Sequence, residues 1–301
     1  MHSVEQLEEM QRLPLSRKIQ ITTARIIEWY QHYDGKVYVA FSGGKDSTVL
    51  LDIVRRIYPD VPAVFSDTGL EFPEVRQFAM NCENVTVVRP EMNFRKVIEV
   101  YGYPIVSKRV ADTVEYGHKP GSFRWKELHG EIIRSNGTPS EFNCEKWCYL
   151  LDAPFKVSSR CCTVMKKRPM KKYQKETGRY PIIATMTTES RSRRATWLRQ
   201  GCNAFSGKKP SSQPMSFWTE NDVLEYLYTY KIPYAPVYGE IVRTDGGGVD
   251  NYRRKAYWLC LLRLWRSFGK GAEPLPAPEG VSPQTLGLLH EAVGGTRLGY
   301  A

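Results

Sequence analysis

Short hydrophobic runs and helical patterns alternate along the first third of the chain. Lys36–Phe41, Pro62–Ser66 and Val85–Val88 are rich in β-branched and aromatic residues and predict three strands. Between them, apolar residues at helical spacing predict helices over Thr48–Ile57 and Pro73–Met80. Strands that alternate with helices favour right-handed crossovers, so we predict an α/β fold with a parallel sheet flanked by helices.

Similar patterns occur on both sides of this block. Residues 1–33 predict a helical lead-in, because apolar residues recur there at helical spacing. Tyr180–Met186 predicts a further buried strand, and Thr219–Tyr230 predicts an amphipathic helix. Cys161–Lys172 is expected to be helical in part, with a break at Pro169.

The regular pattern weakens in two segments. Between about residues 101 and 160, Gly, Pro, Trp and His are scattered, which indicates a substrate-side insertion in a domain that we place at residues 34–251. Residues 252–301 form an atypical tail that we expect to be poorly ordered, and no convincing element follows Gly269.

The net charge of the chain limits the kinds of molecule that it is expected to bind. The formal net charge is +11 and the pI is about 9.2, which favours a nucleotide, a sulfated metabolite or a nucleic acid. No stretch approaches the ~18 consecutive apolar residues of a membrane span. The N-terminus is acidic and polar, unlike a signal peptide. We therefore expect a cytoplasmic protein without a membrane partner.

A phosphate-binding loop is predicted at Ser42–Ser47 (SGGKDS), between the first strand and its helix. Gly43 and Gly44 allow a tight turn and a close approach of the backbone to phosphates. The following helix offers free N–H groups and the positive end of its dipole. The spacing is shorter than that of a Walker A motif, and a simple Ser-Gly turn is the alternative.

Side chains of this phosphate loop add hydrogen bonds and charge. Ser42 and Ser47 are predicted to donate hydroxyl hydrogen bonds to a nucleotide, and Lys45 supplies a cation. Asp46 is predicted to hold Mg²⁺ when the ligand is a triphosphate.

The motifs together carry a family resemblance. The phosphate loop, followed by Ser66–Gly69 (SDTG) and Glu71–Glu74 (EFPE), resembles the phosphoadenosine phosphosulfate (PAPS) reductase family of PP-loop proteins. Later segments follow in the family's order: Cys161–Cys162 with Lys166 or Lys167 and Pro169, Glu189–Ser190 with Arg193, and Pro214–Tyr226 with Trp218 and Asp222. The resemblance covers about Lys36–Asn251. It implies an adenine nucleotide α-hydrolase-like, Rossmann-like fold.

The resemblance also implies which residues bind the nucleotide. It places Asp67 and Thr68 near the nucleotide, although Asp-Thr-Gly is also well suited to an ordinary turn after a strand. Glu189, Ser190 and Arg193 match the family's Glu-Ser-x-x-Arg element. An arginine cluster beside a phosphate site would clamp phosphate or sulfate, whereas the alternative is a solvated basic face. We predict Lys45, Asp46 and Arg193 as catalytic residues.

Four of the seven cysteines lie in one short stretch. Without a secretion signal, such clustering indicates metal or redox chemistry, although buried thiols also serve as small apolar residues. In iron–sulfur members of the family, a Cys-Cys pair joins a C-terminal Cys-x-x-Cys to bind a [4Fe–4S] cluster. Here Cys161 and Cys162 match the pair, but the Cys-x-x-Cys is missing, so the ligand set is incomplete. A less favoured alternative adds Cys144 and Cys148 to form a zinc or cluster site.

The tail is interpreted as frame-shifted. Synonymous codons for Lys255–Pro278 can be chosen so that the next reading frame spells Gly-Cys-Ala-Cys-Cys-Gly, which resembles the missing segment. Tryptophan has one codon, so Trp258 and Trp265 each force a glycine in that frame, and the first one opens the motif. The alternative is a divergent tail in which Cys260 stands alone.

Three functions remain open. The first is an enzyme of sulfur reduction or transfer that acts on an adenylyl sulfate (PAPS or APS) or ATP, with a thiol electron donor. The second is an ATP pyrophosphatase that adenylates a substrate in nucleic-acid thiolation. The regular phosphate loop favours ATP, and the basic surface would contact DNA or RNA. The third is a non-catalytic nucleotide-binding module or a damaged gene product.

Overall fold

The computed structural model describes three stretches of the chain, residues 2–207, 209–243 and 249–251. Internal contacts divide these residues into two compact units. We call residues 2–90 together with residues 169–251 the sheet unit, and residues 91–168 the helical unit. The predicted limits of the lead-in, the nucleotide-binding domain and the insertion stay predictions, and the predicted tail lies outside the described residues.

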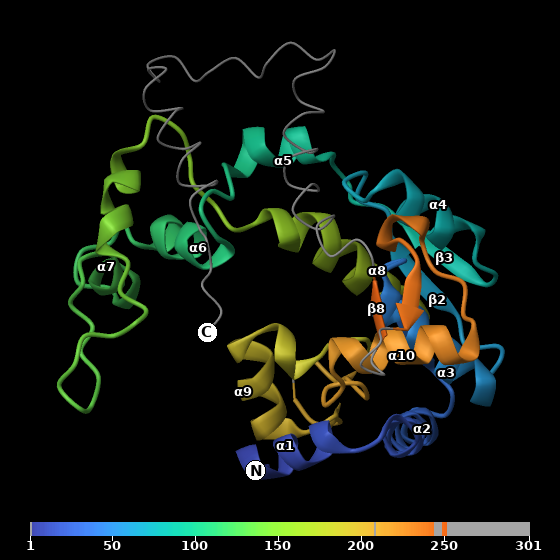
Figure 1. Ribbon diagram of the computed structural model, residues 1–301. Helices are drawn as coiled ribbons and strands as arrows, with labels where there is room; N and C mark the ends of the chain where they lie inside the picture. The colour runs from blue at the N-terminus through green and yellow to red at the C-terminus, as the bar shows by residue number, and fades with distance from the viewer. Residues whose placement is uncertain (1, 208, 244–248, 252–301) are drawn as a thin grey trace. The chain divides into compact units, whose positions relative to one another are not determined.

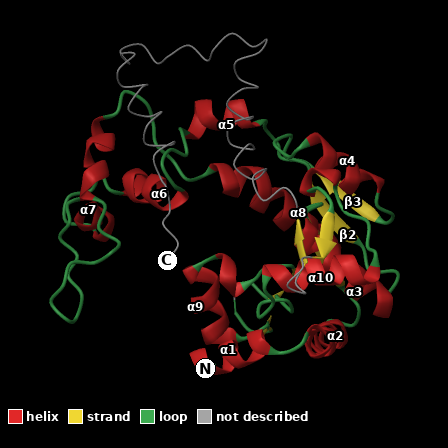
Figure 2. Ribbon diagram, in the orientation of Figure 1, coloured by secondary structure: helices red, strands yellow, loops and turns green. Residues whose placement is uncertain are grey.

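A six-stranded sheet forms the centre of the sheet unit, with the strand order β3-β2-β1-β4-β6-β5. Its strands are Val37–Phe41 (β1), Ala63–Ser66 (β2), Val85–Val88 (β3), Tyr180–Ile183 (β4), Asn203–Ala204 (β5) and Ser211–Ser212 (β6). Neighbouring strands are parallel except β5 and β6, and Val39 pairs with Ala63 on one side and Ile182 on the other. Ile241–Arg243 (β7) and Val249–Asn251 (β8) form a separate antiparallel pair. The mainly parallel sheet confirms the predicted α/β fold (Figure 2).

Helices accompany this sheet, as predicted (Figure 1). They are Val4–Arg12 (α1), Leu15–His32 (α2), Lys45–Ile57 (α3), Pro73–Asn81 (α4), Arg168–Thr177 (α8), Arg191–Gln200 (α9) and Glu220–Tyr230 (α10), with the short turns Thr187–Glu189 (η3) and Pro236–Tyr238 (η4). Helices α2, α3 and α10 pack against one another. None of the described helices is both long and apolar enough to cross a membrane.

The central strand β1 is covered on both faces. Val37, Val39 and Phe41 are at most 3% exposed, and Tyr38, which points to the opposite face, is also buried. Burial raises the pKa of the Tyr38 phenol to about 12, although Gln174 donates a hydrogen bond to its oxygen at 2.7 Å. A strand buried on both faces is typical of the centre of a parallel sheet, because crossover helices cover both sides.

The lead-in helix α2 is fixed to the sheet unit by buried polar contacts. Thr22 donates its hydroxyl to the carbonyl of Pro214 at 3.1 Å and accepts the indole N–H of Trp218 at 2.9 Å. Lys18, which is also buried, forms an ion pair with Asp222 at 2.6 Å. These contacts satisfy polar groups that burial would otherwise destabilise.

The predicted helix break at Pro169 is wrong. The chain is helical from Cys161, and a wide π-type turn over Thr163–Lys167 (η2) leads directly into α8. Proline has no N–H, and its ring collides with the carbonyl four residues earlier in a regular α-helix. In the wide turn, the N–H of Arg168 donates to the carbonyl of Thr163, five residues back. We attribute the tolerance of Pro169 to this local change of helical pitch.

The helical unit contains helices and loops but no extended strand among residues 91–168, where only isolated bridges occur (Figure 2). Its elements are Phe94–Tyr101 (α5), Lys108–Tyr116 (α6), Phe123–Leu128 (α7) and Glu145–Asp152 (η1). A small apolar core joins α6, α7 and η1, and it consists mainly of Val110, Ala111, Val114, Leu128, Cys144, Leu150 and Val157.

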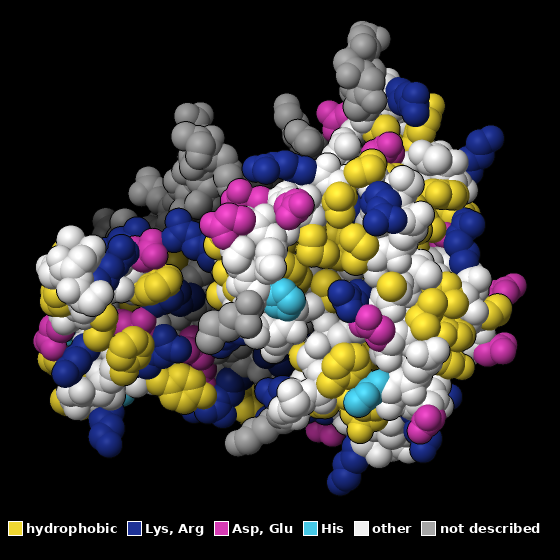
Figure 3. All heavy atoms as spheres, turned by 90° about the horizontal axis from the view of Figure 1, so that it is seen from below, with side chains coloured by type: hydrophobic (Ala, Val, Ile, Leu, Met, Phe, Trp, Pro, Cys, Tyr) yellow, Lys and Arg dark blue, Asp and Glu magenta, His cyan; other side chains and the backbone are white. Residues whose placement is uncertain are grey.

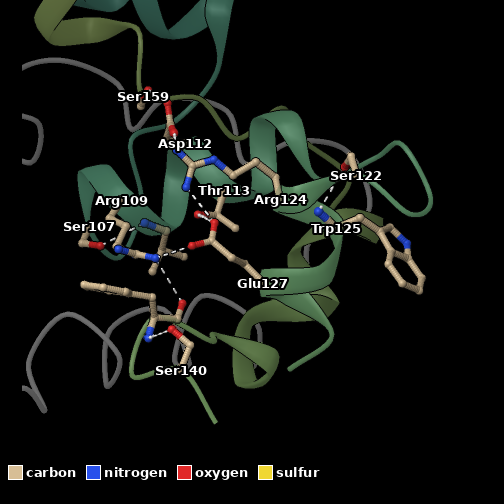
Figure 4. Close-up of polar contacts among 12 residues, drawn as sticks. Ser107, Arg109, Asp112, Thr113, Ser122, Arg124, Trp125, Glu127, Ser140 and Ser159 are labelled. Atoms are coloured by element: carbon tan, nitrogen blue, oxygen red, sulfur yellow. Dashed lines mark hydrogen bonds and ion pairs between the residues drawn. The ribbon is translucent and has the colours of Figure 1, made fainter. Parts of the chain in front are cut away.

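A buried carboxylate organises one side of this unit. Figure 4 shows Arg109 of α6 and Arg124 of α7 converging on Glu127, which is 2% exposed. Arg124 also binds Asp112 at 2.6 Å. The ionic contacts therefore link α6 to α7 where the apolar core is small.

Candidate functional site

The phosphate loop lies between β1 and α3, as predicted. Strand β1 ends at Phe41 and α3 begins at Lys45, with Gly44 as its N-cap residue. No side chain caps this helix end. The first N–H groups of α3 therefore face the loop without a capping acceptor, which is the arrangement that binds anions at helix N-termini.

Glycine is required at the tip of the loop. Gly43 has φ +72°, and a Cβ atom there would lie 2.8 Å from the Val75 carbonyl oxygen and 3.0 Å from the Cβ of Ala79, both on α4. At Gly44 a Cβ would approach the Ser42 hydroxyl and the Tyr238 hydroxyl to 3.2 Å. The loop backbone is thus packed too closely for a side chain at Gly43, and only glycine adopts this turn without strain.

The two serines shape the loop. Ser47 Oγ donates to the Gly44 carbonyl at 2.9 Å, accepts the Ser42 N–H at 3.2 Å and lies 3.0 Å from Ser42 Oγ. Ser42 Oγ accepts the N–H of Gly44 at 3.3 Å. These bonds hold the turn in shape, so the hydroxyls predicted to contact a nucleotide also stabilise the loop itself.

Charged groups surround the start of α3. Lys45 is buried, and its Nζ lies 2.9 Å from Asp46 Oδ1 and 3.5 Å from Glu220 Oε1. Glu220 was missed by the sequence analysis. It is the first residue of α10, and nothing in its local sequence distinguishes it from a surface glutamate at a helix start. The fold thus gathers one cation and two carboxylates beside the phosphate loop.

The Glu189–Arg193 element follows β4 and reaches the same place. Ser190 caps α9 by accepting the N–H of Arg193 at 3.3 Å, and Glu189 forms an ion pair with Arg193. Glu189 also accepts the Met186 N–H at 2.8 Å. Burial lowers the pKa of Arg193, and the negative charge of Asp46 opposes this shift. The charges of Arg193 and Asp46 therefore interact, which brings Arg193 into the surroundings of the phosphate loop.

The order of the strands explains why these segments meet. Strand β1 lies between β2 and β4, and the chain leaves β1 toward β2 before it later returns on the other side as β4. In parallel α/β sheets, loops that leave neighbouring strands in opposite directions open a crevice at the carboxyl ends of the strands. The phosphate loop and the Glu189–Arg193 element are the two loops at this point.

Asp67 and Thr68 follow β2 at the same sheet edge. Asp67 is 5% exposed and receives two bonds from Arg76, at 2.8 and 2.9 Å, and one from Arg89 at 3.2 Å. Hydrogen bonds from Arg76 hold the pKa of Asp67 below its usual range, despite the opposing effect of burial. Thr68 donates its hydroxyl to Glu71 at 2.8 Å. Both side chains are thus engaged in local contacts, and their nucleotide-binding role stays a prediction.

The predicted metal ligands lie in the helical unit. Cys161 and Cys162 are half-buried neighbours at the start of the helix that contains η2, and burial raises the pKa of Cys161. Cys144 is buried, which raises the pKa of its thiol. Cys148 lies 3.6 Å from His129 Nε2.

These cysteines do not assemble into one site. In the part of the chain that the structure describes, no three His, Cys, Asp or Glu side chains are gathered to hold a metal ion. The described residues therefore fit at most part of a four-thiolate cluster. The metal role of Cys161 and Cys162 stays a prediction, and Cys260 and the predicted frame shift fall outside the described residues.

Comparison with known proteins gives a family match over most of the chain. The family model described as the phosphoadenosine phosphosulfate reductase domain matches residues 36–112 and 138–252. An adenosine 5'-phosphosulfate reductase of Lysinibacillus sphaericus is 23% identical over 248 residues, covering 82% of this chain and 86% of the relative. Sulfate adenylyltransferase subunit 2 of Serratia proteamaculans is 24% identical over 246 residues, covering 78% and 72%.

Another relative is longer. An uncharacterized protein of Methanocaldococcus jannaschii is 27% identical over 212 residues, which cover 69% of this chain but 35% of that protein. The chain thus matches about a third of the length of this relative. Among solved structures, a phosphoadenylyl-sulfate reductase of Candida auris in a phosphate complex is 14% identical, with a TM-score of 0.41 and coverage of 79% and 91%. The family assignment rests on the sequence match.

Proposed function

This chain belongs to the phosphoadenosine phosphosulfate reductase domain family, and we propose that it is an adenine-nucleotide-binding enzyme of sulfur reduction or transfer. One observation carries the proposal. Gly43 has φ +72° and packs against α4 where no Cβ fits, so the chain turns tightly into the uncapped start of α3, where N–H groups can bind phosphate. Residues 42–47 lie within the residues that the family model matches, which supports the proposal.

We assign each site residue to the part of the nucleotide that its chemistry suits. The peptide groups of Gly43 and Gly44 and the start of α3 hold phosphate oxygens, with hydroxyl support from Ser42 and Ser47. Lys45 neutralises phosphate charge. On the other side of the crevice, Arg193 holds the sulfate or the outer phosphate, and its ion pair with Glu189 and the Ser190 cap orient the guanidinium. Asp67 and Thr68 border the nucleoside end.

The substrate of the proposed enzyme is an adenylyl sulfate (PAPS or APS) or ATP. Reduction of an adenylyl sulfate requires two electrons from a thiol donor, which we propose as a partner. The relatives do not separate these substrates, because one is named an adenosine 5'-phosphosulfate reductase and another a sulfate adenylyltransferase subunit. A [4Fe–4S] cluster remains a family expectation, and no catalytic step here depends on it.

A second candidate is an ATP pyrophosphatase that adenylates a substrate in nucleic-acid thiolation. Asp46 and Glu220 on either side of Lys45 favour it, since paired carboxylates beside a phosphate site suit Mg²⁺ bound to a triphosphate. In this version Lys45 and Mg²⁺ stabilise the charge that develops on the leaving pyrophosphate. Asp46 then serves as the metal ligand of the reaction.

Calorimetric titration of the purified protein with APS, PAPS and ATP with Mg²⁺ tests the proposal. We expect at least one of them to bind, and Lys45→Ala to weaken that binding about tenfold or more, which corresponds to ~1.4 kcal/mol. Lys36→Ala is the matched control, because Lys36 is an exposed lysine that precedes β1 at the opposite edge of the sheet. If none of the three nucleotides binds, the proposal fails.

Product analysis separates the candidates. Sulfite release from an adenylyl sulfate in the presence of a dithiol supports the first, and pyrophosphate release from ATP supports the second. Binding of a nucleotide without either product, with reductant and metal added, indicates a non-catalytic module or a damaged gene product.

A further inference from the structure

The helical unit contains a cavity of about 550 Å³. This volume falls within the ~300–1,000 Å³ that is typical of pockets for small organic ligands. All of its lining residues lie between Val100 and Arg160, so neither the phosphate loop nor the Glu189–Arg193 element contributes to it. A ligand in this cavity would therefore occupy a site separate from the phosphate loop.

One wall of the cavity is apolar and aromatic. Val114, Leu150 and Val157 are buried core residues that face it, and Tyr101 and Phe155 add two half-buried rings. Tyr103 packs edge-on against Phe155, with ring centroids 5.3 Å apart, so the Phe155 ring is supported from outside the cavity. Such a wall can pack against a flat apolar group of a ligand.

The polar lining has a net positive charge. Glu115 is matched by Arg160, whose Nε donates to it, and it also accepts the hydroxyl of Ser158 at 2.9 Å and the N–H of Ser159 at 3.0 Å. Lys156 also lines the cavity, is exposed and forms no ion pair with any described residue. One cation thus remains after Arg160 and Glu115 neutralise each other, and it favours an anionic group on the ligand.

Arg168 adds a second arginine beside the aromatic wall, next to Arg160. The guanidinium groups of Arg160 and Arg168 lie 5.8 and 5.7 Å from the centre of the Tyr101 ring, and Arg168 donates to the Tyr101 hydroxyl at 3.2 Å. His118 adds a ring with hydrogen-bonding nitrogens to the lining. Aromatic faces combined with arginine and lysine are the groups with which proteins hold nucleobases and their phosphates.

The outer surface of the same unit repeats this combination. The Arg109 guanidinium lies 4.0 Å from the ring centre of Phe142, which is 47% exposed, and Lys146 lies 5.3 Å from the ring centre of Trp147. Figure 3 shows one face of the molecule, on which apolar side chains are interspersed with Lys and Arg. An exposed Phe142 ring and a half-buried Trp147 ring next to cations suit the bases and phosphates of a single strand.

We propose that the cavity of the helical unit binds one nucleotide unit, with its base against the wall of Tyr101 and Phe155 and its phosphate at Lys156 and His118. The nucleotide is either free or an unpaired residue of a nucleic-acid strand, and the surface pairs at Phe142 and Trp147 contact the rest of such a strand. The site goes beyond the function proposed for the phosphate loop and does not depend on it, because every residue named here belongs to the helical unit.

Fluorescence anisotropy of the full chain with a labelled single strand of about 12 nucleotides tests the proposal. AMP and UMP serve as unlabelled competitors. Lys156→Ala and Phe155→Leu are the cavity variants, and the second keeps an apolar side chain while it removes the ring. Lys126→Ala is the matched control, since Lys126 is an exposed lysine of the same unit that does not line the cavity.

We expect the strand to bind and both cavity variants to weaken binding, Phe155→Leu by about tenfold and Lys156→Ala by about threefold to tenfold. Lys126→Ala should change the affinity less than twofold. Calorimetric binding of AMP or UMP that Lys156→Ala weakens, in the absence of strand binding, identifies a free nucleotide as the ligand. Binding of neither probe, or an equal loss in Lys126→Ala and Lys156→Ala, overturns the proposal.

Lys45→Ala distinguishes this site from the phosphate loop. Because Lys45 belongs to the sheet unit, this substitution should weaken adenine-nucleotide binding there and leave strand binding unchanged. A strand that binds equally to wild type, Lys156→Ala and Phe155→Leu contradicts the cavity assignment even if the phosphate loop functions as proposed.

Discussion

The two compact units are stabilised by different interactions. In the sheet unit, apolar side chains cover both faces of a parallel sheet, and the central strand β1 is almost completely buried. In the helical unit, the apolar core is small, and charged contacts around Glu127 and Glu115 link its helices and loops. Burial of apolar area is insensitive to salt at moderate concentrations, whereas partly exposed ion pairs are screened.

This difference also separates two kinds of site. The phosphate loop is built from backbone groups at the edge of a rigid sheet, so its geometry depends on packing. The cavity of the helical unit is built from side chains on short helices and loops, so its geometry depends on ion pairs. We therefore expect the first site to tolerate changes of salt better than the second.

A deletion in the apolar core tests the sheet unit with the largest expected effect. Phe65 lies on β2 and is 1% exposed, so Phe65→Ala leaves a cavity and should lower the free energy of unfolding by about 3–5 kcal/mol. Urea unfolding at low and moderate salt measures the loss, which should be the same at both. Phe65→Leu is the control with a smaller loss. A loss that shrinks with salt would contradict the comparison.

A deletion in the ionic network tests the helical unit. Glu127→Ala leaves Arg109 and Arg124 without their buried acceptor, and we expect a loss of about 2 kcal/mol, reduced from the value for fully buried pairs because both arginines are partly exposed. Hydrogen exchange should show the loss among residues 91–168. Glu131→Ala, an exposed glutamate of the same unit, is the control. Uniform loss across both units would break the distinction between them.

Gly43→Ala separates backbone strain from ligand binding in the sheet unit. Alanine at φ +72° costs about 1–2 kcal/mol of stability, and its Cβ must also displace α4 and the loop. We expect nucleotide affinity, measured by calorimetry, to fall at least about tenfold. Gly178→Ala is the matched control, because Gly178 has φ +67° but nothing within 4 Å of the added Cβ. If both variants bind equally well, close packing at the loop is irrelevant to binding.

The smallest effect concerns acid stability at the sheet edge. The folded state holds the pKa of Asp67 below 3.8, so Asp67 stabilises the fold above its unfolded pKa of about 3.9. That contribution is lost as the pH falls through the depressed folded pKa. Arg76→Gln removes the main cause, and at pH 7 it should lower the stability slightly, because solvent screens the partly exposed Arg76.

Unfolding measured across acid pH checks the sign of this effect. The difference between wild type and Arg76→Gln should narrow as the pH falls below 4 and Asp67 becomes protonated in both proteins. A difference that stays constant down to the lowest accessible pH would show that Arg76 acts through packing and not through the charge of Asp67.

Local sequence was sufficient for the first strands and helices of the sheet unit, whereas β5 to β8 and α9 were not predicted. The first three strands and the helices after the phosphate loop were predicted within a few residues, since period-two and helical patterns report burial directly. Helix α3 begins at Lys45, three residues before the predicted start at Thr48, because the loop closes at Gly44. The break at Pro169 was wrong because the wide turn of η2 depends on hydrogen bonds that a residue pattern does not specify.

The sequence by itself determined the α/β class, the family and the strand-loop-helix setting of Ser42–Ser47, because hydrophobic periods and motif order are features of the chain itself. Only the tertiary structure decided that Glu220 lies beside Lys45. It also decided that Arg76 and Arg89 bind Asp67. The interaction between the charges of Arg193 and Asp46 likewise depends on the fold. The tertiary structure also decided the cavity beside Phe155. Such contacts join segments far apart in the chain, and electrostatic and packing energies depend on distance in space, which only the folded chain fixes.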